Sequence, residues 1–134
     1  MNCWLEFHDS SVGQVISIGA TVKLVLSSAY LHKSEGRPGF DAGTGWRQAG
    51  AIEFGAASVV EVGDIGDGWI IDGSLELASG EVLRGLPVPF DIPGKLKAVF
   101  VFLNGNVLAI EAMGVRLVLT GEPRFVEVVP GDET

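Results

Sequence analysis

One stretch of the chain decides the fold, and it reads Ala98-Val99-Phe100-Val101-Phe102-Leu103-Asn104-Gly105. Its first six residues are all apolar. A β-strand tolerates this when both faces are covered, or when one faces the inside of a barrel and the other a partner. The Asn-Gly pair that follows favours the type I′ turn of a two-residue hairpin. The stretch therefore predicts a core strand that turns back into an antiparallel neighbour.

Apolar residues at spacing two extend this pattern along the chain, as in Val22-Lys23-Leu24-Val25-Leu26 and Val115-Arg116-Leu117-Val118-Leu119. Glycines suited to tight turns occur in Gly19-Ala20, Ser79-Gly80 and Met113-Gly114. No window carries a sustained apolar stripe of helical period with caps at both ends, which predicts that there is no long helix. We expect strands near residues 3–8, 12–18, 21–31, 48–55, 58–62, 69–77, 81–85, 96–103, 107–112 and 115–120, with a last extended stretch near 124–129.

These patterns predict an all-β fold, either an antiparallel β-barrel or a closely packed β-sandwich of about eight to eleven strands. The three prolines of residues 86–94 remove hydrogen-bond donors, so this segment is expected to be an extended crossover. With 134 residues and no stretch typical of a flexible linker, the chain is expected to form a single domain, 1–134.

The charge of the chain limits the classes of partner that we expect it to bind. Seventeen acidic and nine scattered basic residues give a formal net charge of −8, whereas binding to a phosphate backbone needs a concentrated positive surface. No stretch is long and apolar enough to span a membrane, and the N-terminus lacks the pattern of a signal peptide. We therefore expect no nucleic-acid or membrane partner, and a cytoplasmic location.

The apolar content of the chain suggests a protein partner. Hydrophobic residues make up 47% of the sequence, and the mean hydropathy is +0.37. Few charges are left to cover the surface, so we expect a homodimer that shares apolar surface. The single cysteine, Cys3, forms no internal disulfide, in agreement with a reducing compartment, and it is interpreted as a small buried apolar residue.

The longest stretch without strand periodicity is the segment 32–48, and loops of this length in compact domains are usually functional or disordered. Four glycines suit a mobile flap that carries an aromatic anchor and cationic side chains. An ordinary surface loop is the alternative, with Phe40 and Trp46 docked on the core and the charges solvated. The functional interpretation selects His32, Arg37, Asp41, Trp46 and Arg47.

His8-Asp9-Ser10 contains all the residue types of a catalytic triad, but neighbours on a strand point to opposite faces, so adjacency argues against one. Asp9 and Ser10 are better explained as turn residues. His8 is able to meet His32 if their strands are neighbours, and Asp9 or Asp41 would complete a metal site. Two histidines without ligand spacing are a weak signal, so we predict no catalytic residue, metal or cofactor.

The hexapeptide Leu5-Glu6-Phe7-His8-Asp9-Ser10, followed by a hairpin over 12–26, resembles the start of several small bacterial all-β proteins of unknown function, some of them classed as immunity proteins of toxin systems. The resemblance covers about a fifth of the chain. It implies a stoichiometric protein partner and no catalysis. An acidic surface is suited to blocking a basic nuclease.

The sequence thus predicts a non-enzymatic binding or protein-interaction module whose contact surface surrounds the loop 32–48. The alternative is a small-ligand-binding β-barrel, with hydrolase or isomerase activity carried by His8, His32 and Asp41. A deep pocket walled by both histidines favours the alternative, and a filled core favours the interaction module. The residues expected to bind a partner or ligand are His8, His32, Arg37, Asp41, Trp46 and Arg47.

Overall fold

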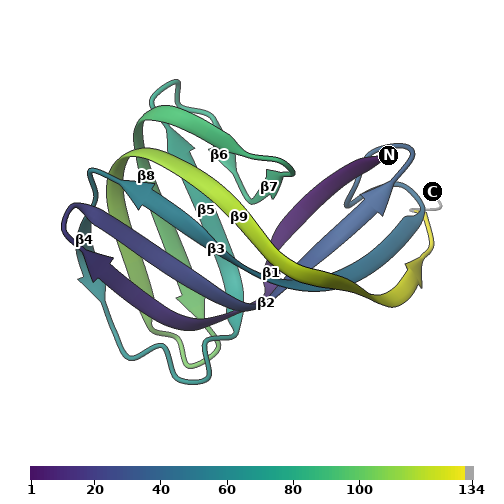
Figure 1. Cartoon of the computed structure of the whole chain (residues 1–134), viewed down its shortest axis with the longest axis horizontal. Helices are drawn as coiled ribbons and strands as arrows, with labels where there is room; N and C mark the ends of the chain where they lie inside the picture. Colours follow the sequence, from purple (N-terminus) through teal and green to yellow (C-terminus); the bar gives the residue numbers. More distant parts are fainter. Residues whose placement is uncertain (132–134) are drawn as a thin grey trace.

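The computed structural model describes residues 1–131, so 132–134 of the predicted domain lie outside the described residues. Within that range every regular element is a β-strand (Figure 1). Residues 1–131 contain no helix that is long and apolar enough to cross a membrane. The strands are β1 (Asn2–Ile18), β2 (Thr21–Ser34), β3 (Gly43–Gly55), β4 (Ser58–Val62), β5 (Ile70–Leu77), β6 (Val82–Leu83), β7 (Gly85–Pro87), β8 (Asp91–Phe102) and β9 (Val107–Val129).

The nine strands form one antiparallel sheet in the order β6-β5-β8-β9-β3-β2-β1-β7, and β4 pairs with β9 off this path. The outermost strands, β6 and β7, are separated in the chain by Arg84 alone. The sheet therefore curls until its two ends approach each other, with β1 facing β5. Within the described residues one isolated bridge joins Ser11 of β1 to Trp69, the residue that precedes β5. We call this unclosed junction between β1 and β5 the seam.

The all-β class, the antiparallel pairing and the number of strands are confirmed. The closed barrel, one of the two expected architectures, is wrong, because the seam lacks a ladder of backbone hydrogen bonds. Gly19, Gly80 and Gly105 adopt the positive φ that their predicted turns require. The predicted turn at Met113-Gly114 is wrong, because both residues lie inside β9.

The core lies between the facing parts of the curled sheet, and β8 crosses it as expected. Ala98, Phe100 and Phe102 are fully buried, whereas Val99 and Val101 on the opposite face of β8 are half-buried. The proline-rich segment 86–94 is extended, but it contributes β7 and the start of β8 to the sheet rather than crossing outside it. Large apolar side chains fill the core, among them Phe7, Phe54, Phe100, Phe102, Leu24 and Ile52.

We call the curled part of the sheet that encloses the core the body. Four strands continue beyond it into a smaller lobe, which we call the arm (Figure 1). It consists of the start of β1, the end of β2, the start of β3 and the end of β9. At the junction between body and arm the register shifts in each successive pair, near Asp9 in β1, near Ser28 in β2 and near Gln48 in β3. Bulges increase local twist and bend strands, so this row of irregularities changes the direction of the four strands between the body and the arm.

Candidate functional site

A cleft of about 510 Å³ opens at the seam, between the arm and the body. Trp4, Glu6 and His8, which alternate along β1, form one wall. Ile71, Asp72 and Gly73 of β5 form the facing wall, Arg84 lies where β6 and β7 meet, and residues 37–40 complete the rim. The cleft therefore exists because the sheet curls without closing.

The loop 35–42 between β2 and β3 is fixed to the arm by several hydrogen bonds. Asn2 Nδ2 donates to the Gly36 carbonyl at 2.6 Å, and Ser34 Oγ donates to the Ala42 carbonyl at 2.7 Å. The Asp41 carboxylate accepts the Arg37 backbone N–H at 2.5 Å, which is the local turn expected of an Asp in a loop. These bonds position Arg37 and Phe40 at the cleft.

His32 holds the loop 35–42 in place through a hydrogen bond to its backbone. Its side chain lies on β2, is 2% exposed, and accepts the Gly39 backbone N–H at Nδ1. Among the described residues Nε2 has no hydrogen-bond partner. His32 fits here because Gly43 of the neighbouring strand has no side chain, and a Cβ at that position would lie 2.9 Å from Nε2. The geometry assigns His32 to holding Gly39 rather than to lining the cleft.

Tyr30 lies next to His32 on the same face of β2. Its hydroxyl donates to Glu127 Oε1 at 2.7 Å, and its ring covers Gly45, where a Cβ would clash with it. Burial and the Glu127 carboxylate both raise the pKa of Tyr30, so the phenol stays protonated and remains the donor. This bond joins β2 to β9 across β3 inside the arm.

The rim of the cleft combines apolar surface with cationic side chains. The Arg37 guanidinium lies over the Phe40 ring, 4.1 Å from its centre, and Phe40 is 55% exposed. Arg84 forms a loose ion pair with Asp72 at 3.4 Å. No carboxylate among the described residues forms an ion pair with Arg37, so its charge is available to a bound anion.

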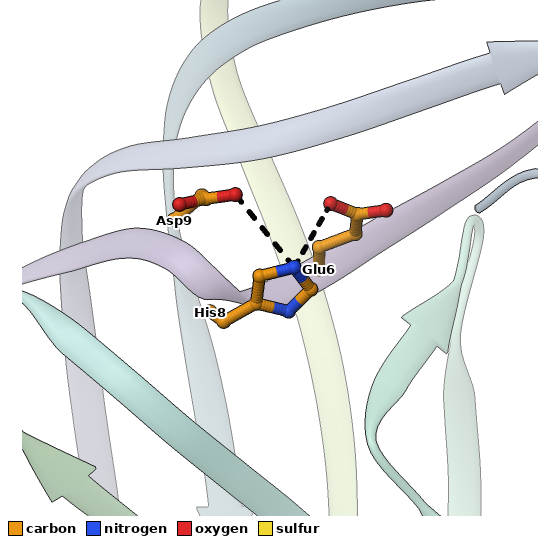
Figure 2. Close-up of side chains that lie close together, drawn as sticks. All are labelled: Glu6, His8 and Asp9. Atoms are coloured by element: carbon orange, nitrogen blue, oxygen red, sulfur yellow. Dashed lines mark ion pairs between the residues drawn. The ribbon is translucent and has the colours of Figure 1, made fainter.

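Glu6, His8 and Asp9 gather their side chains at the β1 wall (Figure 2). His8 Nε2 lies 3.6 Å from a carboxylate oxygen of Glu6 and 3.6 Å from one of Asp9. Neighbours on a regular strand would point apart, but Asp9 has a φ of 72°, and this bulge brings its carboxylate to the side of His8. Burial raises the pKa of Glu6, and His8 and His32 partly offset this. Oxygen and imidazole ligands in this arrangement can hold a metal ion.

Of the six predicted site residues, His8 and Arg37 line the cleft. His32 and Asp41 hold the loop behind it, through Gly39 and Arg37 respectively. Trp46 packs against the core from the other face of the arm, where its ring meets Phe125 at 5.5 Å edge to face, and Lys33 lies over it at 4.5 Å. The six residues do not form one group.

Arg47 lies at the junction of body and arm rather than in a loop. Its Nη1 donates to the Asp9 carbonyl at 2.7 Å and to Ser28 Oγ at 3.1 Å, and its guanidinium lies over the Tyr30 and Trp69 rings. The predicted loop 32–48 was too long, because β2 continues to Ser34 and β3 begins at Gly43. Docking of Trp46 on the core is confirmed, whereas docking of Phe40 is wrong.

Sequence reasoning missed Trp4, Glu6, Ile71, Asp72 and Arg84. Trp4 and Glu6 come from β1, whereas Ile71 and Asp72 come from β5, and these two strands approach each other only because the sheet curls. One local signal existed, since Trp4, Glu6 and His8 alternate along one strand and place an unusual set of polar and aromatic side chains on one face.

Cys3 lies on the opposite face of β1 from Glu6, where it is half-buried and packs against the core. Burial raises the pKa of its thiol, which lowers the fraction of reactive thiolate. This environment agrees with the interpretation of Cys3 as a packing residue.

Comparison of the chain with family models, with curated proteins and with solved structures gives no match.

Proposed function

We infer that the chain is a non-enzymatic binding module, and that a segment of a partner protein binds in the cleft at the seam. One observation carries this proposal: the loop 35–42 presents, on the rim of a preformed cleft, an exposed aromatic ring and a guanidinium that forms no ion pair with a carboxylate of residues 1–131. Clefts of this size with apolar walls and a few polar groups are the usual form of binding sites. The core beside the cleft is filled by side chains.

The catalytic alternative finds less support in the geometry. His8 contacts Glu6 and Asp9, His32 contacts Gly39, and Asp41 contacts the Arg37 backbone. A general base and its orienting carboxylate need hydrogen-bond contact with each other. His8, His32 and Asp41 do not form such a chain of contacts, so a hydrolase or isomerase mechanism through these three has no geometric basis.

The chemistry of the walls defines the segment that fits. Trp4, Phe40 and Ile71 offer apolar surface, and Arg37 offers a cation in the geometry that suits carboxylates. We expect a segment that places an apolar side chain between these residues and a carboxylate against Arg37. A stoichiometric protein partner is also what the resemblance to immunity proteins implies.

The three tryptophans provide the test, because Trp4 lines the cleft while Trp46 and Trp69 lie elsewhere. Titration with the dipeptide N-acetyl-Leu-Glu should shift the indole N–H signal of Trp4 in a ¹H–¹⁵N NMR spectrum and leave the other two unchanged. The same dipeptide with both carboxylates amidated should bind more weakly. Equal shifts at all three indoles, or at none with millimolar peptide, contradict the proposal.

A matched pair of variants distinguishes binding in the cleft from unspecific binding to exposed apolar surface. Phe40 and Phe125 are both 55% exposed, but only Phe40 lines the cleft. Phe40→Ala and Arg37→Ala should each weaken the Trp4 response several-fold, and Phe125→Ala should not. A response that survives Phe40→Ala and Arg37→Ala but disappears in Phe125→Ala places binding on the other face of the arm.

A small organic ligand is the second candidate, because the cleft has the volume of a small-molecule site. A fragment mixture that shifts Trp4 while the dipeptide does not would favour this alternative over a protein partner.

A further inference from the structure

We propose that Glu6, His8 and Asp9 form a binding site for a first-row divalent metal ion, with Zn²⁺ as the probe of choice. This goes beyond the proposed function, because peptide binding in the cleft does not require a metal. The three ligand atoms, one imidazole nitrogen and two carboxylate oxygens, lie within 4.8 Å of one another (Figure 2). His8 Nε2 is equally distant from both carboxylates, at 3.6 Å.

The donor set selects the class of ion. One neutral imidazole with two carboxylates suits Zn²⁺, Mn²⁺, Fe²⁺ and Co²⁺, whereas Ca²⁺ and Mg²⁺ prefer oxygen ligands alone. Ligand atoms around such an ion lie roughly 3 Å apart, given bonds of about 2.0–2.2 Å. The observed separations of 3.6 Å need small side-chain rotations to reach that geometry.

The backbone that carries the three ligands is held in place from both sides. Ser10, which is fully buried, donates from Oγ to the Glu6 carbonyl at 2.6 Å and accepts the Tyr30 N–H at 2.9 Å. Arg47 donates to the Asp9 carbonyl at 2.7 Å. These contacts fix the bulge that turns Asp9 toward His8, so the ligands are organised before an ion arrives.

The exposure of the ligands leaves room for further coordination. The side chain of Glu6 is 15% exposed, whereas those of His8 and Asp9 are 59% and 54% exposed. Glu6 and His8 also line the cleft. A bound ion would therefore keep positions open to water or to a ligand, as three-ligand metal sites do.

The experiment is calorimetric titration of the full chain with ZnCl₂ at pH 7.5, accompanied by a long-range ¹H–¹⁵N spectrum of the two histidine rings. We expect one ion per chain at micromolar affinity and a shift of the His8 ring nitrogens, with the His32 ring unchanged. His8→Gln and Asp9→Asn should each weaken binding by more than about tenfold. Glu35→Gln, an exposed carboxylate change in the loop, should have no effect.

Further outcomes of the titration support or overturn the proposal. Binding that is unchanged in Cys3→Ser supports the site, and binding that is lost there assigns the ion to the thiol and overturns the proposal. A dissociation constant weaker than about 1 mM, or equal binding in His8→Gln with a native-like amide spectrum, also overturns it.

Discussion

Gly45 allows Tyr30 to lie across the arm. A Cβ at Gly45 would lie 2.9 Å from Tyr30 Cζ and 3.0 Å from Glu127 Cγ, so Gly45→Ala should displace the ring and break its hydrogen bond. We expect a loss of about 1–3 kcal/mol in the free energy of unfolding, measured by urea denaturation. Gly55→Ala is the control, because a Cβ there meets open space, and a comparable loss in both variants would contradict this role of Gly45.

Glu6 should make stability depend on pH. Its folded pKa is raised above the unfolded value, so between these values the folded chain binds more protons, and stability falls as the pH rises through this window. Glu6→Gln should remove this fall, so that its melting temperature changes less between pH 4 and pH 8 than that of the parent. Glu122→Gln, an exposed carboxylate, should leave the pH profile unchanged. If the stability of the parent and that of the Glu6→Gln variant rise with pH to the same extent in this window, the raised pKa is wrongly assigned to Glu6.

At the scale of single residues, sequence reasoning found part of the site. Arg37 was selected as a cationic side chain of the long segment 32–48, and His8 as a possible neighbour of His32, and both reach the cleft. Trp46 and Arg47 were selected from the same segment, yet one packs on the core and the other fixes the junction of body and arm. Residue type alone does not reveal which face of a strand is covered, and that is decided by contacts distant in sequence.

Arg47 is the side chain that joins the bulges of neighbouring strands. Its bonds to Asp9 in β1 and Ser28 in β2 span three strands at the point where the registers shift. Arg47→Ala should lower the free energy of unfolding by about 2 kcal/mol, because the Asp9 carbonyl and the Ser28 hydroxyl lose a charged donor. Arg84→Ala, which removes an exposed ion pair, should cost less than about 1 kcal/mol. Equal losses would show that Arg47 acts as an ordinary surface charge.

At the scale of elements, the turns that use glycine at positive φ were predictable, and the continuity of the long strands was not. Gly19, Gly80 and Gly105 end strands as their dipeptides indicate. Gly114 lies inside β9, and the residues near Asp9 lie inside β1, where a bulge bends the strand without ending it. A bulge and a turn use the same residue types, so local sequence does not distinguish them.

At the scale of the molecule, the expected homodimer stays a prediction. Exposed apolar side chains gather near the end of β9, at Phe125, Val126 and Val128. Light scattering at tens of micromolar should give twice the chain mass if this surface is shared between two copies. A monomer at that concentration would leave the high apolar content without this explanation.

The seam determines the shape of the whole molecule, because the closeness of β5 to β1 sets the width of the cleft. Gly73 of β5 makes this approach possible, since a Cβ there would lie 2.9 Å from the Phe7 Cβ and 3.0 Å from the Phe100 ring. Phe7 and Phe100 are buried and packed edge to face at 5.3 Å, so neither yields without disturbing the core.

Gly73→Ala should therefore overpack the seam and lower the free energy of unfolding by about 1–3 kcal/mol. Because Gly73 also lines the cleft, the indole signal of Trp4 should move in the folded variant while that of Trp46 stays in place. Gly55→Ala again serves as the control for both measurements. A Gly73→Ala variant with parental stability and an unshifted Trp4 signal would mean that β1 and β5 do not pack closely in solution, and the cleft would then lose its facing wall.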